Sequence, residues 1–315
     1  MRPTLRQLEY VVTVHRLGRF GLAAEMLNVS QPSLSAQIAT VEAEMGLRIF
    51  KRDRGGVQTT ARGEEFVRRA RRILREFENL RSAMSSDLPF AGRLRLGVLP
   101  SIGPYLLPPA VKDIHAQVPG LRVVVREENT RDLELGLKSG RFDVIISTPE
   151  DHPNTHQRRL FNERLWIAVA TDDPLATLAR DALAADLEGR LFLTLDQSHR
   201  LSRIAYALAA ECGGVVSDDY EGTTLDSILL MAASGTGVAI LPELFARRQA
   251  VHRDEVVVRR LDVANANRDL ALLVRREDSA DSGHDLLTTA LRRVARKYGL
   301  GAVPAPDTGG IRARR

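Results

Sequence analysis

Hydrophobic residues near the start of the chain recur every three or four positions, which is the period of one face of an α-helix. The pattern stops near Gly18 and resumes as a second, shorter face that ends before Asn28. Ser30 is a natural N-cap, Pro32 suits a first helical turn, and Gly46 stops the third stretch. We therefore predict three short helices. Their apolar faces consist of Leu5, Leu8 and Val12, then Phe20, Ala23, Ala24 and Leu27, then Leu34, Ile38, Val41 and Met45.

A basic turn and a long helical pattern come next. Residues 51–56 read Lys-Arg-Asp-Arg-Gly-Gly, which has the charge and shape of a hairpin tip, or wing. From Thr60 to about Ser86, apolar residues repeat at spacings of four, three, four and three, as in the seam of a coiled coil. This regularity predicts pairing of two such helices, and hence a dimer. The seam consists of Phe66, Ala70, Ile73, Phe77 and Leu80.

The period changes after Gly92, where apolar runs of strand length alternate with helical stretches. This alternation predicts a parallel sheet in an α/β domain. The predicted strands are 93–98, 121–125, 142–146, 191–195, 238–241 and 269–274, and the predicted helices are 105–118, 130–139, 201–212, 224–234 and 284–298. Residues 302–315 are rich in Pro, Gly and Arg without an apolar period, so we predict a disordered tail.

Composition points to a polyanionic partner. Residues 1–90 hold fifteen Lys and Arg against ten Asp and Glu, whereas the rest of the chain holds thirty of each. The net charge of +5 therefore lies in the first domain, where it favours a polyanion, although a basic solvated face would have the same composition. No stretch is long and apolar enough for a membrane span, and no signal-peptide core follows Met1. We expect a cytoplasmic protein that does not enter a membrane.

The residues offer little chemistry for catalysis. A single cysteine, Cys212, excludes an internal disulfide and an all-cysteine metal site, and the histidines are scattered, so we expect neither metal nor cofactor. Residues 235–237, Gly-Thr-Gly, lack the strand and third glycine that a dinucleotide fingerprint requires. No Ser/His/Asp order, carboxylate pair or phosphate loop stands out. We expect that the protein is not an enzyme.

The strongest motif lies between the second and third predicted helices. Ala24 permits a close helix crossing, Val29 fills the turn, and burial of the third helix's apolar face leaves its polar first turns outside. This is the pattern of a helix-turn-helix that reads base edges; a plain helical hairpin is the alternative. The predicted DNA-binding residues are Ser30, Gln31, Pro32, Ser33, Ser35, Ala36 and Gln37 on the helix and Lys51, Arg52 and Arg54 on the wing.

This segment resembles the LysR-type regulators. The shared signature comprises the alanine pair at 23–24, Val29-Ser30-Gln31-Pro32-Ser33-Leu34-Ser35, Gln37-Ile38, Val41-Glu42, Glu44-Met45-Gly46-Leu47, Phe50, Arg52, Thr60 and Gly63. The resemblance covers about 300 residues and implies an α/β protein with a mostly helical, winged helix-turn-helix at its N-terminus. It also implies a two-lobed, Rossmann-like sensing domain similar to periplasmic binding proteins. The implied partners are double-stranded DNA, a small-molecule effector and further copies of the chain, as a dimer or tetramer, with RNA polymerase a candidate.

The resemblance also implies a division into domains. The expected parts are a winged helix-turn-helix (1–60), a linker and dimerisation helix (61–91), a regulatory domain (92–301) with one lobe of residues 92–163 plus 269–301 and another of residues 164–268, and the tail (302–315).

Within the family the sequence looks most like the peroxide-sensing OxyR branch. The likeness is carried by residues 7–12, 97–108 and 223–226. In that branch a reactive cysteine follows a Gly-His pair and a second cysteine stands nine residues later; here Arg200 and Ala209 occupy those positions. Cys212 lies three residues further on, where we expect a buried, inert thiol. The resemblance therefore supports the fold and DNA binding but not a disulfide switch.

The same branch implies an effector pocket between the lobes. We expect it to be formed by Ser101, Thr130, His199, Arg200 and Arg203. The two arginines are three residues apart and would share one helix face, an arrangement suited to a carboxylate or phosphate. We therefore expect a small anionic effector. The alternative for this pair is that one arginine binds a nearby acid such as Asp196 or faces solvent.

Three other functions stay open at this point. The protein could bind DNA constitutively with an unresponsive sensing domain, respond to oxidation through Cys212, or serve as an enzyme or solute-binding protein on the same α/β fold. The missing signal peptide disfavours the solute binder, and the basic first domain disfavours both the enzyme and the solute binder. Whether the regulator activates or represses is also open.

Overall fold

The computed structural model describes residues 3–53, 56–84, 88–278 and 283–301. The chain divides into two compact units, with the main division between Gly92 and Arg93. The predicted tail (302–315) and Arg54 lie outside the described residues, and the finer domain limits remain predictions. Within the described part, no helix has both the length and the apolar character needed to cross a bilayer.

The first unit contains a three-helix core, a hairpin and a long helix. Its elements are α1 (Leu5–Leu17), α2 (Phe20–Met26), α3 (Gln31–Met45), β1 (Phe50–Asp53), β2 (Gly56–Thr59) and α4 (Ala61–Ala83). Helices α1 and α3 begin or end at the capping residues that the sequence predicted. The Ser30 hydroxyl accepts a hydrogen bond from the backbone N–H of Ser33 (3.3 Å), and Gly18 and Gly46 end α1 and α3 in the left-handed conformation.

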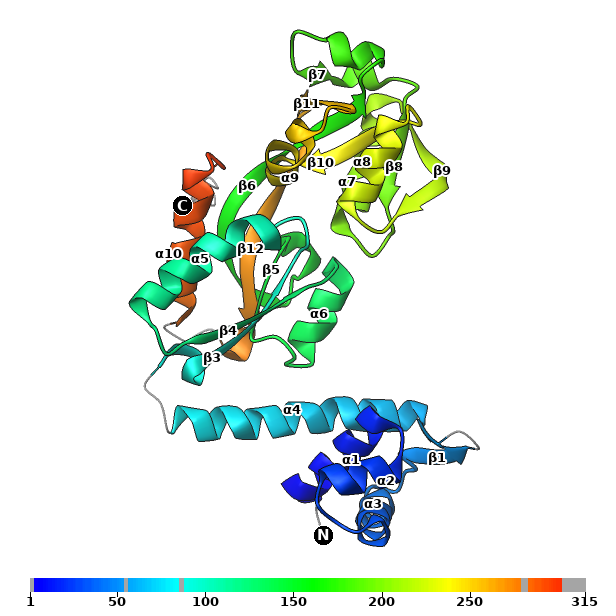
Figure 1. Ribbon diagram of the computed structural model, residues 1–315, viewed down its shortest axis with the longest axis vertical. Helices are drawn as coiled ribbons and strands as arrows, with labels where there is room; N and C mark the ends of the chain where they lie inside the picture. Colours follow the sequence, from blue (N-terminus) through cyan, green and yellow to red (C-terminus); the bar gives the residue numbers. More distant parts are fainter. Residues whose placement is uncertain (1–2, 54–55, 85–87, 279–282, 302–315) are drawn as a thin grey trace, which may run out of the picture. The chain divides into compact units, whose positions relative to one another are not determined.

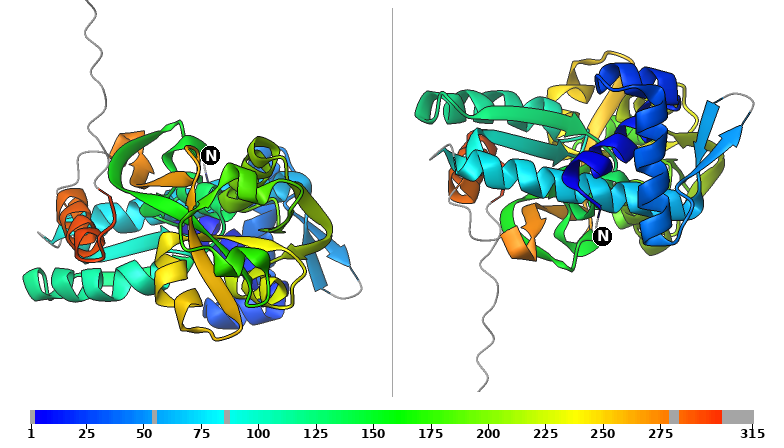
Figure 2. Two further views of the ribbon diagram at one scale, coloured as in Figure 1. Left: turned by 90° about the horizontal axis from the view of Figure 1, so that it is seen from above. Right: turned by 90° about the horizontal axis from the view of Figure 1, so that it is seen from below.

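One apolar cluster holds these elements together. Leu34, Ile38 and Val41 of α3 are buried in it, as the helical pattern predicted, and Val67 of α4 packs into the same cluster. The Glu42 carboxylate accepts hydrogen bonds from the backbone N–H groups of Ile49 (2.7 Å) and Phe50 (3.1 Å), which fixes the start of the hairpin. The hairpin β1–β2 is antiparallel and projects beyond the helices of its unit (Figure 2).

The second unit is a two-lobed α/β structure. Its strands are β3 (Arg93–Val98), β4 (Arg122–Glu127), β5 (Val144–Ser147), β6 (Thr155–Ala170), β7 (Ala182–Leu183), β8 (Leu191–Leu195), β9 (Val215–Gly222), β10 (Val238–Pro242), β11 (Val256–Asp262) and β12 (Asn267–Arg275). Its helices are α5 (Gly103–Gln117), α6 (Thr130–Lys138), α7 (Arg200–Cys212), α8 (Leu225–Ala233), α9 (Glu243–Arg248) and α10 (Gly283–Lys297).

The sheet is mixed, so the prediction of a parallel sheet is wrong. Parallel pairs do occur on the flanks, where β4, β3 and β5 run together in one lobe and β10, β8 and β9 in the other. Between them, β12 is antiparallel to β5 and β6, and β6 is antiparallel to β10 and β11. The alternation of strands and helices holds only on the flanks, because the central strands connect the lobes instead of belonging to one βαβ series.

The long strand β6 belongs to both lobes. Its first part pairs with β12, and residues 165–170 pair with β10 and β11 of the second lobe. In Figure 1, β6 and β12 form the bridge between the lobes, with α5 and α10 side by side on one and α7 and α8 on the other. The chain passes between the lobes through β6 and β12. Side chains on these two strands are therefore placed to contact both lobes.

Candidate functional site

The first turns of α3 present polar side chains to solvent. Ser30, Gln31 and Ser33 are exposed and Ser35 is half-buried, whereas Leu34 is fully buried on the opposite face. The remaining predicted residues of this helix, Pro32, Ala36 and Gln37, are also exposed. Gln37 accepts a hydrogen bond from the side-chain amide of Gln7 (2.9 Å). The serines and glutamines among these residues form a polar surface at the N-terminal end of α3, and Pro32 and Ala36 are exposed within it.

The wing residues lie on the hairpin. Lys51 is exposed on β1, and Arg52 follows it on the same strand. The backbone N–H of Val57 on β2 donates to the carbonyl of Gly18 (2.9 Å), so the hairpin is tied to the turn after α1. A side chain at position 63 would collide with the Ile49 carbonyl, which explains why the chain carries Gly63 at the start of α4.

The predicted seam of α4 has two parts. Phe66 packs against the core of its own unit and Ala70 is buried. Ile73, Phe77 and Leu80 are 49%, 44% and 58% exposed, and each lies about one helical turn after the one before it. Three large apolar side chains on one exposed helix face are the feature expected of a helix that pairs with another.

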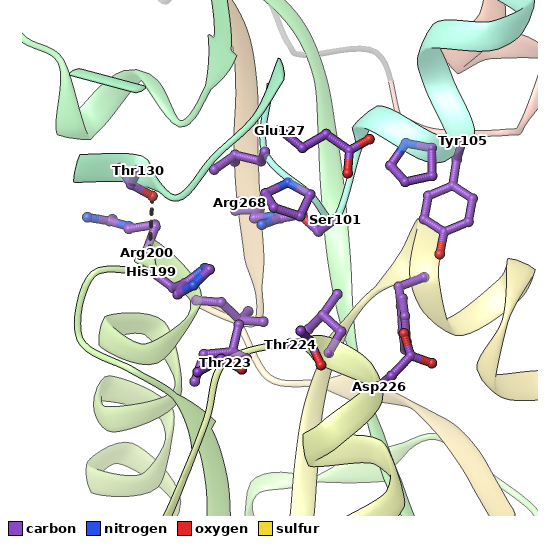
Figure 3. A pocket seen from close by; sticks show the side chains of 17 residues that line it. Ser101, Tyr105, Glu127, Thr130, His199, Arg200, Thr223, Thr224, Asp226 and Arg268 are labelled. Atoms are coloured by element: carbon purple, nitrogen blue, oxygen red, sulfur yellow. Dashed lines mark hydrogen bonds between the residues drawn. The ribbon is translucent and has the colours of Figure 1, made fainter. Parts of the chain in front are cut away.

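A cavity of about 290 Å³ lies between the lobes of the second unit (Figure 3). It is lined by segments from both lobes and from the bridge. Its lining residues are Leu99, Pro100, Ser101, Pro104, Tyr105, Glu127, Thr130, Leu195, His199, Arg200, Leu201, Thr223, Thr224, Leu225, Asp226, Phe245 and Arg268. Four of the five predicted effector residues are among them, and Arg203 is the exception.

The predicted arginine pair already has a carboxylate partner. Arg200 and Arg203 both contact one oxygen of Asp151, at 3.2 Å and 2.6 Å. The backbone N–H of Arg200 donates to the Thr130 hydroxyl (3.2 Å), which joins α7 of one lobe to α6 of the other. The acid considered from the sequence, Asp196, instead accepts a hydrogen bond from the backbone N–H of Ser198 (2.8 Å).

His199 caps α7 beside these arginines. Its Nε2 lies 3.5 Å from a carboxylate oxygen of Asp196. Burial lowers the pKa of His199, and this outweighs the opposing effect of Asp196. The imidazole is therefore neutral near pH 7 and adds no charge to the cavity.

A buried ion pair that the sequence did not reveal reaches the cavity through Arg268. Arg268 on β12 contacts Glu163 on β6 at 2.8 Å, and their side chains are 3% and 0% exposed. Arg268 also donates to the Ser101 hydroxyl (2.9 Å), while Glu163 accepts from the backbone N–H of Leu244 on α9 (2.8 Å). Burial raises the pKa of Glu163, and Arg268 opposes that rise. This network connects the two lobes through the bridge.

Two further acids, also missed from the sequence, line the cavity. Figure 3 shows Glu127 and Asp226 on the side of Tyr105, with Thr130, His199 and Arg200 on the other side. Asp226 pairs with Arg253 (2.9 Å). Desolvation raises the pKa of Glu127. A sequence signal existed for Glu127, since it follows a predicted strand at the edge where ligands of α/β sheets usually bind.

Cys212 lies at the end of α7 and is only 5% exposed. Burial raises the pKa of its thiol, and Glu211 adds to that rise. A buried thiol with a raised pKa is a poor nucleophile. Among the described residues, no group of three or more His, Cys, Asp or Glu side chains is placed to hold a metal ion.

Comparison with known families identifies both units. Residues 5–64 match the family described as "Bacterial regulatory helix-turn-helix protein, lysR family", and residues 89–296 match the "LysR substrate binding domain". The chain belongs to the LysR family. It is a DNA-binding transcriptional regulator with an effector-binding domain, as the sequence predicted.

Several similar proteins belong to the OxyR branch. OxyR of Escherichia coli K12, a DNA-binding transcriptional dual regulator, is 32% identical over 91% of this chain and 94% of its own. The hydrogen peroxide-inducible genes activator of Pectobacterium carotovorum is 30% identical over 93% and 97%. Among solved structures, a cysteine variant of full-length OxyR from Pseudomonas aeruginosa superposes with a TM-score of 0.69 at 28% identity, covering 92% of this chain and 98% of that one. With a single cysteine, this LysR regulator lacks the redox pair expected in that branch.

Proposed function

We propose that this LysR regulator reads DNA bases with the first turns of α3 and holds the DNA backbone with its wing. The observation that carries the proposal is the polar, exposed N-terminal surface of α3 opposite a fully buried apolar face. In a helix-turn-helix, that part of the second helix enters the major groove. Lys51, Arg52 and Arg54 supply the cations that contact phosphates. These contacts position the protein on DNA without reading its sequence.

Self-association accompanies this function. Ile73, Phe77 and Leu80 of α4 pair with the same face of a second copy, and contacts of the regulatory domain extend the dimer to a tetramer. A symmetric pair of DNA-binding heads binds a site with dyad symmetry. We further propose that the protein works in the cytoplasm and catalyses no reaction.

A small molecule in the cavity between the lobes controls the regulator. The mixed polar and apolar lining supports this, because such cavities bind ligands that a few polar groups orient. Control by thiol oxidation is the second candidate, since relatives are named as activators of hydrogen peroxide-inducible genes and Cys212 is present. The burial and raised pKa of Cys212 disfavour it. A constitutive regulator would have the same fold with no response to any ligand.

Salt-dependent DNA binding separates the two kinds of contact. Gln31→Ala should reduce discrimination between a cognate site and random DNA by roughly 1–3 kcal/mol. Arg52→Ala should weaken binding to all sequences and flatten the logarithmic salt slope by about one unit. Lys297→Ala changes an exposed cation of the second unit and should alter neither quantity. If Gln31→Ala weakens specific and random binding equally, α3 does not read bases there.

The redox alternative has its own test. DNA binding of the wild type and of Cys212→Ser is compared before and after treatment with hydrogen peroxide. We expect no change in either protein, because the thiol is buried and has no cysteine partner in the chain. A peroxide response that the serine variant loses would establish redox control instead.

A further inference from the structure

The α7 end of the cavity carries positive charge. Arg200 and Arg203 share the single carboxylate of Asp151, so the three side chains together retain one positive charge. The Nε–H of Arg200 is buried without an acceptor among the described residues. The first turn of α7 adds the partial positive charge of a helix N-terminus. This end of the cavity therefore favours an anionic group.

The opposite end is negative. Glu127 lines the cavity and has no hydrogen bond or ion pair with any described residue, and Figure 3 places it across from Arg200. The other charged groups are already compensated, since Asp226 pairs with Arg253 and Arg268 pairs with Glu163. The Glu127 carboxylate lies beside Gly103 at the start of α5 and is the acid on this side without a cationic side-chain partner among the described residues.

A ligand with a single charge would meet repulsion at one end. A simple organic anion bound at Arg200 extends toward the Glu127 carboxylate, and a simple amine bound at Glu127 extends toward Arg200. Charges that face each other across a partly desolvated cavity interact more strongly than in water. The cavity lining also includes the apolar residues Leu99, Pro104, Leu225 and Phe245, which can contact a hydrocarbon segment.

We propose that the effector is a zwitterion: a small amino acid with its carboxylate beside Arg200, its ammonium beside Glu127 and a hydrocarbon segment between them. This inference rests on the proposed function, because it names the ligand class of the same regulatory cavity. It refines the expectation of an anionic effector, since the carboxylate is kept and a cationic group is added.

Calorimetry with full-length protein tests this with three probes of nearly equal shape. These are 6-aminohexanoate, hexanoate and hexylamine, and a series of linear amino acids of four to eight carbons covers the unknown spacing. We expect the best amino acid to bind at least about tenfold more tightly than its one-charge analogues, as one satisfied charge partner is worth about that factor. Hexanoate or hexylamine binding as tightly as the best amino acid, or no binding by any amino acid of the series, would overturn the proposal.

Variants at the two ends sharpen the test. Glu127→Gln should remove the preference for the amino acid over hexanoate, and Arg200→Gln should remove the preference over hexylamine. Glu255→Gln alters an exposed acid that does not line the cavity and should keep both preferences. An unchanged preference in Glu127→Gln, with wild-type thermal unfolding, would contradict the assignment of the ammonium to Glu127.

The same protein samples are assayed for DNA binding, which keeps the two proposals apart. Intact sequence-specific DNA binding with tighter binding of hexanoate rejects only the zwitterion. If the wild-type protein shows no preference for specific DNA, the proposed function is rejected, whatever the calorimetry gives.

Discussion

The polar end of α3 and the effector cavity are organised in opposite ways. The α3 residues come from one short segment and stand in solvent on a helix whose apolar face is buried. The cavity residues come from both lobes and the bridge, and most of its charges are already paired within the protein. The proposed DNA-binding surface is thus already exposed to solvent, whereas most charges at the proposed effector cavity are ion-paired within the protein.

The largest expected effect of a single change falls on the buried pair. Glu163→Ala leaves the Arg268 guanidinium buried without its partner, so it should lower the free energy of unfolding by about 3–5 kcal/mol. Trp166, the single tryptophan, lies on the bridging strand β6 close to Glu163, and its fluorescence reports the unfolding of the second unit.

An exposed ion pair provides the control for that measurement. Arg293 and Asp113 are 3.4 Å apart and 56% and 37% exposed. Arg293→Ala should cost less than about 1 kcal/mol, because solvent screens such pairs. Equal losses for Glu163→Ala and Arg293→Ala would mean that the buried network does not hold the lobes together.

A somewhat smaller effect is expected on assembly through α4. Phe77→Glu places a charge on the exposed apolar face and should weaken dimerisation at least about a hundredfold, since each copy loses an aromatic contact worth roughly 2 kcal/mol. Glu78→Ala changes the neighbouring exposed residue and should leave the dimer intact. Sedimentation at micromolar concentration measures both. A wild type that is monomeric while it binds DNA normally would refute pairing through this helix.

The smallest expected effect is on the pH dependence of stability, through His199, which lines the cavity. Burial lowers the pKa of His199 below its ordinary value of about 6.5. Below that pH the unfolded chain binds a proton that the folded protein does not, so stability falls as pH decreases toward the folded-state pKa. His199→Gln should flatten this slope in the Trp166 unfolding signal. His15→Gln, at a half-buried histidine of the first unit, should not. If the slope of His199→Gln also matches the wild type, His199 is not the group responsible.

Local patterns predicted α3 well and the cavity only in part. Ser30, Gly46 and the period of Leu34, Ile38 and Val41 all lie within one segment, so the helix and its exposed face follow from short-range rules. Ser101, Thr130, His199 and Arg200, which the resemblance brings together, line one cavity, and their role in binding an effector stays a prediction. The resemblance did not predict that Asp151 already binds both arginines.

The rest depends on contacts that no local pattern encodes. Glu163 and Arg268 lie 105 positions apart in the sequence, and each alone looks like an ordinary charged residue of a polar stretch. The strand β6 was missed because its first five residues, Thr155 to Arg159, include no buried side chain, so no apolar period marks its start. Charged residues are buried there because their partners on β12 become available only in the folded bridge.

The most direct test of the account is a genome-wide map of the sites that the full-length protein occupies in its host, made for the wild type and for the double variant Gln31→Ala with Ser35→Ala. The account predicts that the wild type is concentrated at a limited set of dyad-symmetric sites upstream of genes, and that the double variant loses this concentration while it still binds DNA in general. Equal, diffuse occupancy by both proteins, or an unchanged set of sites in the variant, would contradict the claim that this LysR regulator reads its targets with the first turns of α3.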